Sequence, residues 1–379
     1  MPPRMTLPVI ELKPDSRPIP AEQREEVLAS PGFGHHFTDH MVTITWTEDA
    51  GWHFARLVPY GPLPIDPANL TLHYSQTVFE GLKVFRGPDG NLGAFRPEEN
   101  ARRFQASARR MAMPELPEKT FLAACEALVA QDRAWVPSRP GHSLYLRPFM
   151  FATESGLGVR AAREFLFVVI ASPTDGYFAG EVRPVSVWVA EEYVRAAPGG
   201  TGAAKTGANY AASLMGQAQA AAQGCDQVVW LDALERRWVE EMGAMNLFFV
   251  YGERIVTPEL TGSLLPGITR ASLLTLARDL GYKAEEARVS LQDWRRDSAD
   301  GSLTEVFACG TAAGVVPVGS VKTALAQWTV GDGRPGEVTM RLRETLRQIQ
   351  SGAAADPHGW MREMAGADHT APGRQAARS

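Results

Sequence analysis

A single lysine stands in a long stretch of small residues, and its isolation suggests a reactive amine. Lys205 lies in "GGTGAAKTGANYAASL" (199–214), and no other charged residue occurs between Arg195 and Asp226. Small neighbours allow a bulky ligand to approach the amine closely. An ammonium group that loses its water loses part of its preference for the charged form, so the free amine becomes a nucleophile. A lysine on an ordinary surface loop is the alternative, which this composition disfavours.

The same stretch differs by one residue from a phosphate-binding P-loop, GxxxxGK[ST]. Ala204 stands where the second glycine of that motif belongs, and Gly207 falls where a helix should begin. The glycine before the lysine normally frees the backbone to curl round the phosphates. A nucleoside triphosphatase, with the strand that ends at Asp232 holding its magnesium ion, is therefore a disfavoured alternative.

Two other stretches have the composition of phosphate-binding turns. The segment "SLLPGITRASLL" (263–274) runs from a Pro-Gly turn into a helix whose first turn includes Ile268 and Thr269. The free N–H groups of a first helical turn and a nearby hydroxyl bind phosphate, although Thr269 alone is equally typical of an N-cap. The segment "FACGTAAGVV" (307–316) leaves an apolar strand through a glycine and Thr311, which is otherwise an ordinary turn.

Two predicted strands carry charged residues that a core should exclude. Glu240 and Glu241 are adjacent in "WVEEMGAMNLFF" (238–249), and strand alternation predicts that one faces solvent and the other points inward. An inward carboxylate needs a partner, and a protonated ring nitrogen is one. Tyr145 and Arg147 lie two apart in "LYLRPF", on one strand face, where the guanidinium can fork a carboxylate. A structural ion pair is the alternative for this arginine.

Together these groups form the set that pyridoxal 5′-phosphate requires. The lysine forms a Schiff base with the cofactor and the two turns hold its phosphate. The inward acid keeps the pyridine nitrogen protonated, so that the ring accepts electrons. The arginine recognises a substrate carboxylate. The residues therefore predict a pyridoxal-phosphate enzyme.

The chain resembles a branched-chain amino-acid aminotransferase of the bacterial type, in fold type IV of the pyridoxal-phosphate enzymes. The resemblance covers nearly the whole chain, and its most specific stretches are "LHYSQTVFEGLKVFR", "LYLRP", "KTGANYAASL", "EEMGAMN", "GSLLPGITR" and "CGTAA". It implies an α+β fold with a smaller N-terminal α/β domain, a larger C-terminal domain and the cofactor site between them. It also implies ping-pong transfer of the amino group of L-leucine, L-isoleucine or L-valine to 2-oxoglutarate. A D-amino-acid aminotransferase and an aminodeoxychorismate lyase are the alternatives within this fold.

The resemblance also assigns roles to individual residues. Lys205 matches the Schiff-base lysine, which shuttles the proton. The other cofactor-binding positions are Arg103, Arg195, Tyr210, Glu241, Ile268, Thr269 and Thr311. The substrate pocket is lined by Phe33, Tyr74, Phe79, Tyr145, Arg147, Val159, Ala244, Met245 and Ala312. Val159 matches a residue from the neighbouring subunit, so a homodimer is expected. The family's Lys-x-Gly-Gly-Asn-Tyr motif has Ala208 in place of its second glycine here.

The elements that must position these residues alternate between strands and helices without a regular βαβ pattern, which favours the α+β class. The expected organisation is an extended arm (1–30), a small domain (31–172), a linker (173–184), a large domain (185–363) and a tail (364–379). Apolar patterns predict strands at 41–48, 52–60, 143–152, 164–172, 185–194, 227–231 and 247–252 and around 288 and 306, and helices at 97–111, 117–135, 209–223, 269–281 and 337–350.

Composition excludes several other classes of protein. The 379 residues carry a formal net charge of −5, so no basic surface for nucleic acid is expected. The three cysteines are far apart and no His/Cys cluster occurs, which predicts neither disulfides nor a metal site. The longest strongly apolar run, "FLFVVIA", is too short to cross a membrane. A cytoplasmic enzyme without membrane or nucleic-acid partners is expected.

Overall fold

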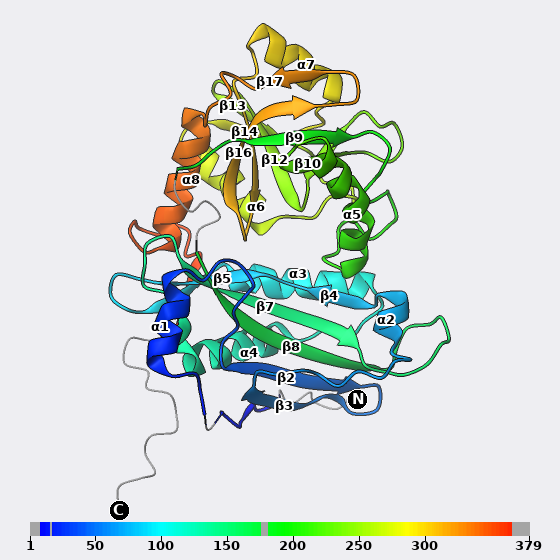
Figure 1. The fold of residues 1–379 in the computed structure, drawn as a ribbon, viewed down its shortest axis with the longest axis vertical. Coiled ribbons are helices and arrows are strands. Elements are labelled where there is room, and N and C mark those ends of the chain that lie inside the picture. Colours follow the sequence, from blue (N-terminus) through cyan, green and yellow to red (C-terminus); the bar gives the residue numbers. More distant parts are fainter. Residues whose placement is uncertain (1–7, 16, 176–180, 366–379) are drawn as a thin grey trace, which may run out of the picture. The chain divides into compact units, whose positions relative to one another are not determined.

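The computed structural model describes residues 8–15, 17–175 and 181–365 (Figure 1). The chain divides into two compact units, residues 1–176 with 349–379 and residues 177–348. Each unit combines a large β-sheet with helices, so the predicted α+β class is confirmed. Across the described residues, no helix is both long and apolar enough to cross a bilayer.

The first unit is built on a nine-stranded sheet in the order β1-β3-β2-β8-β7-β5-β6-β18, with β4 paired to β7. Strands β7 and β8 pair antiparallel along ten residues, in a register that sets Tyr145 opposite Ser172 and Arg147 opposite Ile170. Alternation along β7 therefore keeps Tyr145 and Arg147 on one face of the sheet. The strands are β1 (Glu11–Leu12), β2 (His40–Thr47), β3 (Gly51–Pro59), β4 (Thr77–Phe79), β5 (Leu82–Arg86), β6 (Leu92–Phe95), β7 (Ser143–Ala152), β8 (Glu164–Thr174) and β18 (Met361–Ala365).

Two long helices, α3 (Pro97–Arg110) and α4 (Glu118–Gln131), pack on this sheet. Helix α3 has proline at its first position, acidic residues in its first turn and arginines in its last turn, an arrangement that complements the helix dipole. Its Phe104 ring lies 5.5 Å from the rings of Phe121 in α4 and Phe167 in β8. These buried aromatic rings join the two helices to the sheet. The shorter helices of the unit are α1 (Ala21–Ala29) and α2 (Leu70–Tyr74).

The sheet of the second unit closes on itself. Its order is β11-β10-β9-β16-β15-β12-β13-β14, and β11 pairs with β12 as well as with β10. Six strands thus form a closed ring filled mainly by buried aliphatic and aromatic side chains. The strands are β9 (Val185–Ala190), β10 (Gln227–Leu231), β11 (Val239–Met242), β12 (Met245–Tyr251), β13 (Arg254–Thr257), β14 (Lys283–Glu286), β15 (Glu305–Gly310), β16 (Gly314–Lys322) and β17 (Gln327–Thr329).

Helix α5 (Gly207–Ala222) packs against β9 and β10 of this ring. Gly216 allows the close approach, because a Cβ at this position would lie 2.4 Å from the Trp230 ring of β10. The other helices are α6 (Ile268–Asp279), α7 (Leu291–Asp300) and α8 (Glu337–Gln350), of which α8 extends two residues past the boundary between the units. The strand expected around residue 288 is wrong, because residues 287–289 form an irregular segment between β14 and α7. Ser290 then caps α7 by accepting a hydrogen bond from the Asp293 N–H.

The extended arm predicted for residues 1–30 is wrong for Ala21–Ala29, which form α1. Pro20 precedes this helix and Glu22 lies in its first turn, and both are helix-start signals. Strand β1 pairs parallel with β3. Residues 1–7 and 16 lie outside the described residues.

The C-terminal boundary predicted for the large domain (185–363) is wrong, because residues from Ile349 onward belong to the first unit. Strand β18 pairs antiparallel with β6 of the first unit, and Arg362 in β18 forms ion pairs with Glu98 and Glu126 at 2.9 Å. This return makes the first unit the longer of the two in residues, whereas the smaller domain was expected there. A five-residue strand whose two polar residues, Arg362 and Glu363, are adjacent lacks the alternation that would mark it in the sequence. Residues 366–379 of the predicted tail, and 176–180 of the predicted linker, lie outside the described residues.

Candidate functional site

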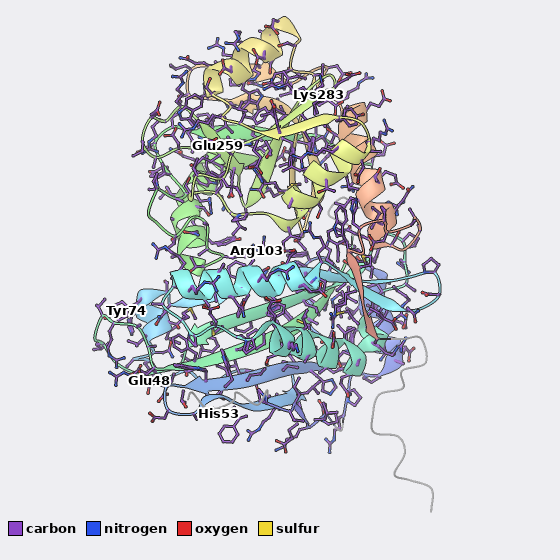
Figure 2. The ribbon with its side chains drawn as sticks, turned by 180° about the vertical axis from the view of Figure 1, so that it is seen from behind. Glu48, His53, Tyr74, Arg103, Glu259 and Lys283 are labelled. Atoms are coloured by element: carbon purple, nitrogen blue, oxygen red, sulfur yellow. The ribbon has the colours of Figure 1, made fainter. Side chains whose placement is uncertain are left out.

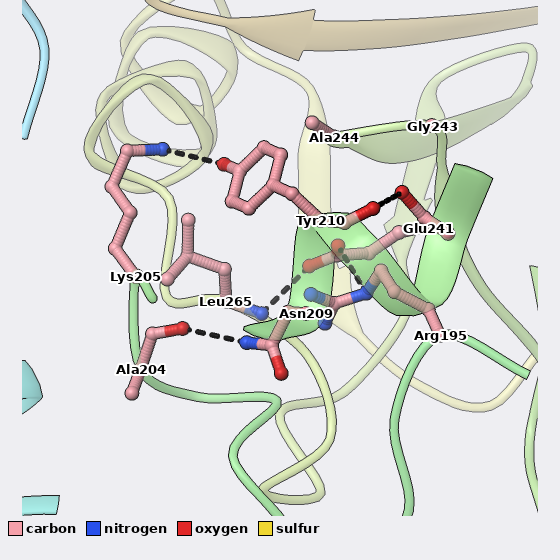
Figure 3. Close-up of a pocket in the computed structure, with 10 residues that line it drawn as sticks. Arg195, Ala204, Lys205, Asn209, Tyr210, Glu241, Gly243, Ala244 and Leu265 are labelled. Carbon is pink, nitrogen blue, oxygen red and sulfur yellow. Dashed lines mark hydrogen bonds and ion pairs between the residues drawn. The ribbon is translucent and has the colours of Figure 1, made fainter. Parts of the chain in front are cut away.

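Lys205 lies on the loop between β9 and α5, and this loop is firmly hydrogen-bonded. The Asn209 side chain donates to the carbonyl oxygens of Thr201 at 2.7 Å and Ala204 at 2.8 Å. The Lys205 amine lies 3.0 Å from the Tyr210 hydroxyl (Figure 3). The amine is therefore held at one wall of a pocket, which excludes a loose surface lysine. That pocket is lined by Arg195, Ala204, Lys205, Asn209, Tyr210, Ser213, Glu241, Gly243, Ala244 and Leu265.

The backbone of the lysine loop argues against a P-loop. The N–H of Gly200 donates to the carbonyl of Ala197, and the N–H of Ala204 donates to the carbonyl of Thr201, both at 2.9 Å. A P-loop needs its N–H groups to converge on phosphate oxygens. Two of these N–H groups are instead used inside the loop, so the nucleoside triphosphatase reading is not favoured.

Glu241 on β11 points into the same pocket (Figure 3) and is almost completely buried. Its Oε1 accepts hydrogen bonds from the Leu265 N–H at 2.6 Å and from the Asn246 amide at 3.3 Å. Its Oε2 lies 3.1 Å from Nε of Arg195. Burial raises the pKa of Glu241, while the positive charge of Arg195 opposes that shift. The predicted inward acid is thus present, with an arginine beside it.

The expectation that one of the two adjacent acids faces solvent is wrong, because Glu240 is buried as well as Glu241. The two carboxyl groups do lie on opposite faces of β11, but Glu240 is only 5% exposed. Its Oε1 accepts a hydrogen bond from the Ser263 hydroxyl, and burial raises its pKa. Residues 261–266, which come between β13 and α6, cover this face. Strand alternation is a local sequence pattern and cannot predict this tertiary contact.

The start of α6 has the geometry of an anion-binding helix terminus. Its N-cap is Gly267, so Thr269 is the second helical residue and not the N-cap. The N–H groups of the first turn have no acceptor within the helix. A Cβ on Gly267 would lie 2.0 Å from the Asn246 side-chain oxygen, so a larger residue there would displace the Asn246 side chain. Arg270 turns away to pair with Glu286 at 2.7 Å.

Other predicted residues of the second unit are not among those that line this pocket. Met245 follows Ala244 at the start of β12, and Ile268 begins α6. Thr311 and Ala312 lie in the turn between β15 and β16.

A separate cluster in the first unit contains the predicted substrate-binding aromatic residues. The Arg147 guanidinium lies 4.8 Å from the Phe79 ring centre and 5.5 Å from that of Tyr145, and one of its nitrogens lies 3.4 Å from the Tyr145 hydroxyl. Phe33 contacts Tyr145 edge to face at 5.1 Å. Among the described residues, Arg147 contacts these aromatic rings and has no carboxylate partner, which disfavours the structural ion-pair alternative. Its Nε is buried without a hydrogen-bond partner there.

Three further residues predicted for the site also lie in the first unit. Tyr74, on α2 (Figure 2), donates its hydroxyl hydrogen to the Leu157 carbonyl at 2.6 Å. Val159 is 83% exposed. Arg103, on α3, forks Glu80 through Nε and Nη2 at 2.7 and 2.8 Å.

Sequence reasoning missed three residues that hold the predicted ones. Glu80 pairs with Arg103 and is fully buried, Asn246 bonds Glu241, and Asn209 fixes the lysine loop. Each was present in a quoted motif, and a buried polar residue that needs a partner was the available signal.

Comparisons with known proteins agree with this geometry. A family model described as "Amino-transferase class IV" matches residues 77–321. A probable branched-chain-amino-acid aminotransferase of Streptomyces coelicolor is 65% identical over 95% of this chain and 100% of that protein. A branched-chain-amino-acid aminotransferase of Mycolicibacterium smegmatis is 58% identical over 92% of this chain and 96% of its own length.

Solved structures give the same result. The branched-chain amino acid aminotransferase of Escherichia coli superposes with a TM-score of 0.71 at 28% identity, covering 85% of this chain and 99% of that one. A second enzyme of that name, from T.th., was solved with pyridoxamine 5′-phosphate. It gives a TM-score of 0.71 at 28% identity, covering 85% of this chain and 98% of that one.

Proposed function

This chain belongs to the class IV aminotransferases, and we propose that it transfers the amino group of L-leucine, L-isoleucine or L-valine to 2-oxoglutarate. The products are the branched 2-oxo acids and L-glutamate. The resemblance to branched-chain aminotransferases predicted from the sequence is confirmed by relatives of 57–65% identity over almost the whole chain. The D-amino-acid aminotransferase and aminodeoxychorismate lyase readings are not favoured.

The cofactor of this family is pyridoxal 5′-phosphate, and the residues of the second unit fit it. The pocket contains an amine, a hydroxyl and a buried carboxyl group, supplied by Lys205, Tyr210 and Glu241. A helix N-terminus with a threonine beside it suits the phosphate. When bound, the cofactor supplies an electron sink conjugated with the reacting carbon.

Each of these pocket residues then has its own role in the reaction. Lys205 holds the cofactor through its amine and, once released, moves the substrate Cα proton. Tyr210, 3.0 Å away, orients that amine. Glu241 holds a proton at the pyridine nitrogen, a task suited to a buried carboxyl group whose pKa is raised. Arg195 balances its charge at 3.1 Å.

We assign the phosphate to Ile268, Thr269 and Thr311, whose backbone positions suit an anion. Arg103 is assigned to the phosphate by the resemblance, and its pairing with Glu80 through Nε and Nη2 orients its guanidinium.

We also assign substrate binding to the nine residues predicted from the sequence. The aromatic rings of Phe33, Phe79 and Tyr145 offer apolar area to a branched side chain, and Arg147 offers its guanidinium to the γ-carboxylate of 2-oxoglutarate. The remaining members are Tyr74, Val159, Ala244, Met245 and Ala312.

Assembly and location remain predictions. A homodimer in which the Val159 region reaches the neighbouring active site is supported by the exposure of two apolar side chains there, Leu157 at 70% and Val159 at 83%. We keep the cytoplasm as the predicted location. The division at linker 173–184 likewise stays a proposal.

The observation that carries the proposed function is the meeting of Lys205, Tyr210 and Glu241 in one pocket of a class IV chain. The test is glutamate formation from 2-oxoglutarate with L-leucine, L-isoleucine, L-valine or D-alanine as donor. We expect activity with the three branched L-amino acids and none with D-alanine, and no activity from Lys205→Ala. A preference for D-alanine overturns the proposed substrate class.

A further inference from the structure

Two adjacent carboxyl groups bond the same loop from opposite faces of one strand. We call residues 261–266 the clamp loop. Glu241 accepts a hydrogen bond from the Leu265 N–H of this loop at 2.6 Å. On the other face of β11, Glu240 accepts a hydrogen bond from the Ser263 hydroxyl. Both carboxyl groups are at least 95% buried.

The clamp loop also holds the arginine that pairs with Glu241. The Ser263 carbonyl accepts a hydrogen bond from Nη2 of Arg195, and Nε of the same guanidinium lies 3.1 Å from Glu241. Asn246 closes the arrangement by donating to Glu241 at 3.3 Å and to the Leu265 carbonyl at 3.1 Å. Ser263 therefore contacts Glu240 through its side chain and Arg195 through its backbone.

We propose that Glu240 is a positioning residue, which anchors Ser263 so that the clamp loop fixes both Arg195 and the carboxyl group of Glu241. The inference rests on the proposed role of Glu241 at the cofactor ring. Glu240 itself acts only through the loop. Nothing in the proposed chemistry uses it directly, yet it occupies a buried place where an unpaired acid is costly.

The contacts of Glu240 indicate which of its properties matters. Its Oε2 is buried and has no hydrogen-bond partner among the described residues, while Oε1 receives the Ser263 hydroxyl. Burial raises the pKa of this group, which favours the neutral acid over an anion competing for Arg195. The required feature is thus a carbonyl-type acceptor, which glutamine also provides.

The test compares Glu240→Ala and Glu240→Gln in the full-length holoprotein. The readouts are the dissociation constant of pyridoxal phosphate and the apparent pKa of its visible absorption band. We expect Glu240→Ala to weaken cofactor binding about tenfold and to shift the band's pKa. We expect Glu240→Gln to stay within about twofold of the parent, since the acceptor is kept. Thr257→Val is the matched control, because it removes another buried hydroxyl of this unit, 2.7 Å from the Leu247 carbonyl.

Repeating Glu240→Ala in a Glu241→Gln protein separates a positioning role of Glu240 from a general loss of stability. In Glu241→Gln the group being positioned is already altered, so adding Glu240→Ala should weaken binding by no more than about twofold. Equal losses in both backgrounds, or a Glu240→Ala protein that only unfolds earlier, as Thr257→Val does, overturn the inference. Should Glu240→Ala not fold, Ser263→Ala breaks the same contact from the other side and carries the same expectation. A Glu241→Gln protein with unchanged cofactor binding and spectrum overturns the proposed role of Glu241 itself, and the inference with it.

Discussion

Replacing Gly202 by alanine should force apart the lysine loop and the clamp loop. A Cβ at this position would lie 2.2 Å from the Ser263 carbonyl oxygen and 2.6 Å from its carbonyl carbon and Cα. These are backbone atoms, which cannot rotate away as a side chain can. Ordinary contact requires the two segments to separate by roughly 1 Å. That movement strains the Arg195 guanidinium, which donates to the carbonyls of both Gly202 and Ser263.

The expected loss of unfolding free energy is about 3 kcal/mol. Overpacking costs about 1–3 kcal/mol, and weakening a hydrogen bond from a charged donor adds about 1 kcal/mol. In a unit of this size such a loss lowers the melting temperature by roughly 6–12 °C. The assays are thermal unfolding and the dissociation constant of the cofactor, which should rise because the loop carries Lys205.

Gly61→Ala is the matched control for this prediction. A Cβ at Gly61 meets no atom within 4 Å, so the same substitution should change stability by less than about 1 kcal/mol. If Gly202→Ala and Gly61→Ala unfold at the same temperature and bind the cofactor equally, the packing of the two loops is not as described.

Three other perturbations have defined outcomes. Arg147→Ala should reduce kcat/KM for 2-oxoglutarate at least about tenfold more than for leucine, and equal losses in the two half-reactions would remove its proposed role. Burial lowers the pKa of His40, but the hydrogen bond and charge of Asp132 raise it overall. The stability contributed by the protonated His40 is therefore full below pH 6.5 and lost as the pH rises through the raised pKa. The variant His40→Gln should flatten the pH dependence of the unfolding free energy in urea between about pH 6 and 8. An unchanged pH dependence would contradict this. Gly216→Ala should cost about 2 kcal/mol in the same assay, since its Cβ would overlap the Trp230 ring, and a neutral result would mean that α5 packs differently.

The strands and helices with long apolar patterns were predictable from the sequence. Strands β7 and β8 follow the predicted ranges closely, because both are largely apolar runs rich in aromatic or β-branched residues, which favour strands. Helix α3 was equally clear, because it opens with proline and acidic residues and carries apolar residues at helical spacing. Strand β18 was missed because its pairing with β6 stabilises it more than local propensity does, whereas α1 was missed although Pro20 and Glu22 are local helix-start signals.

The candidate site was predictable as a list of residues but not as a set of contacts. The proximity of Lys205 and Tyr210 follows from five-residue spacing across a helix start. The burial of Glu240 does not, because residues 261–266 cover it from more than 20 positions away. The pairing of Glu80 with Arg103 likewise joins a loop to a helix and leaves no local pattern.

Borohydride reduction of the holoprotein tests the central claim most directly. It fixes the bond between the cofactor aldehyde carbon and whichever lysine holds it, and peptide mass spectrometry then locates the added mass. The chain has six lysines, so the answer distinguishes among few candidates. The account predicts the modification on Lys205 alone, and its loss when the protein is first converted with L-leucine to the aminated cofactor form. Modification of another lysine, or no modification after incubation with pyridoxal phosphate, would contradict the account.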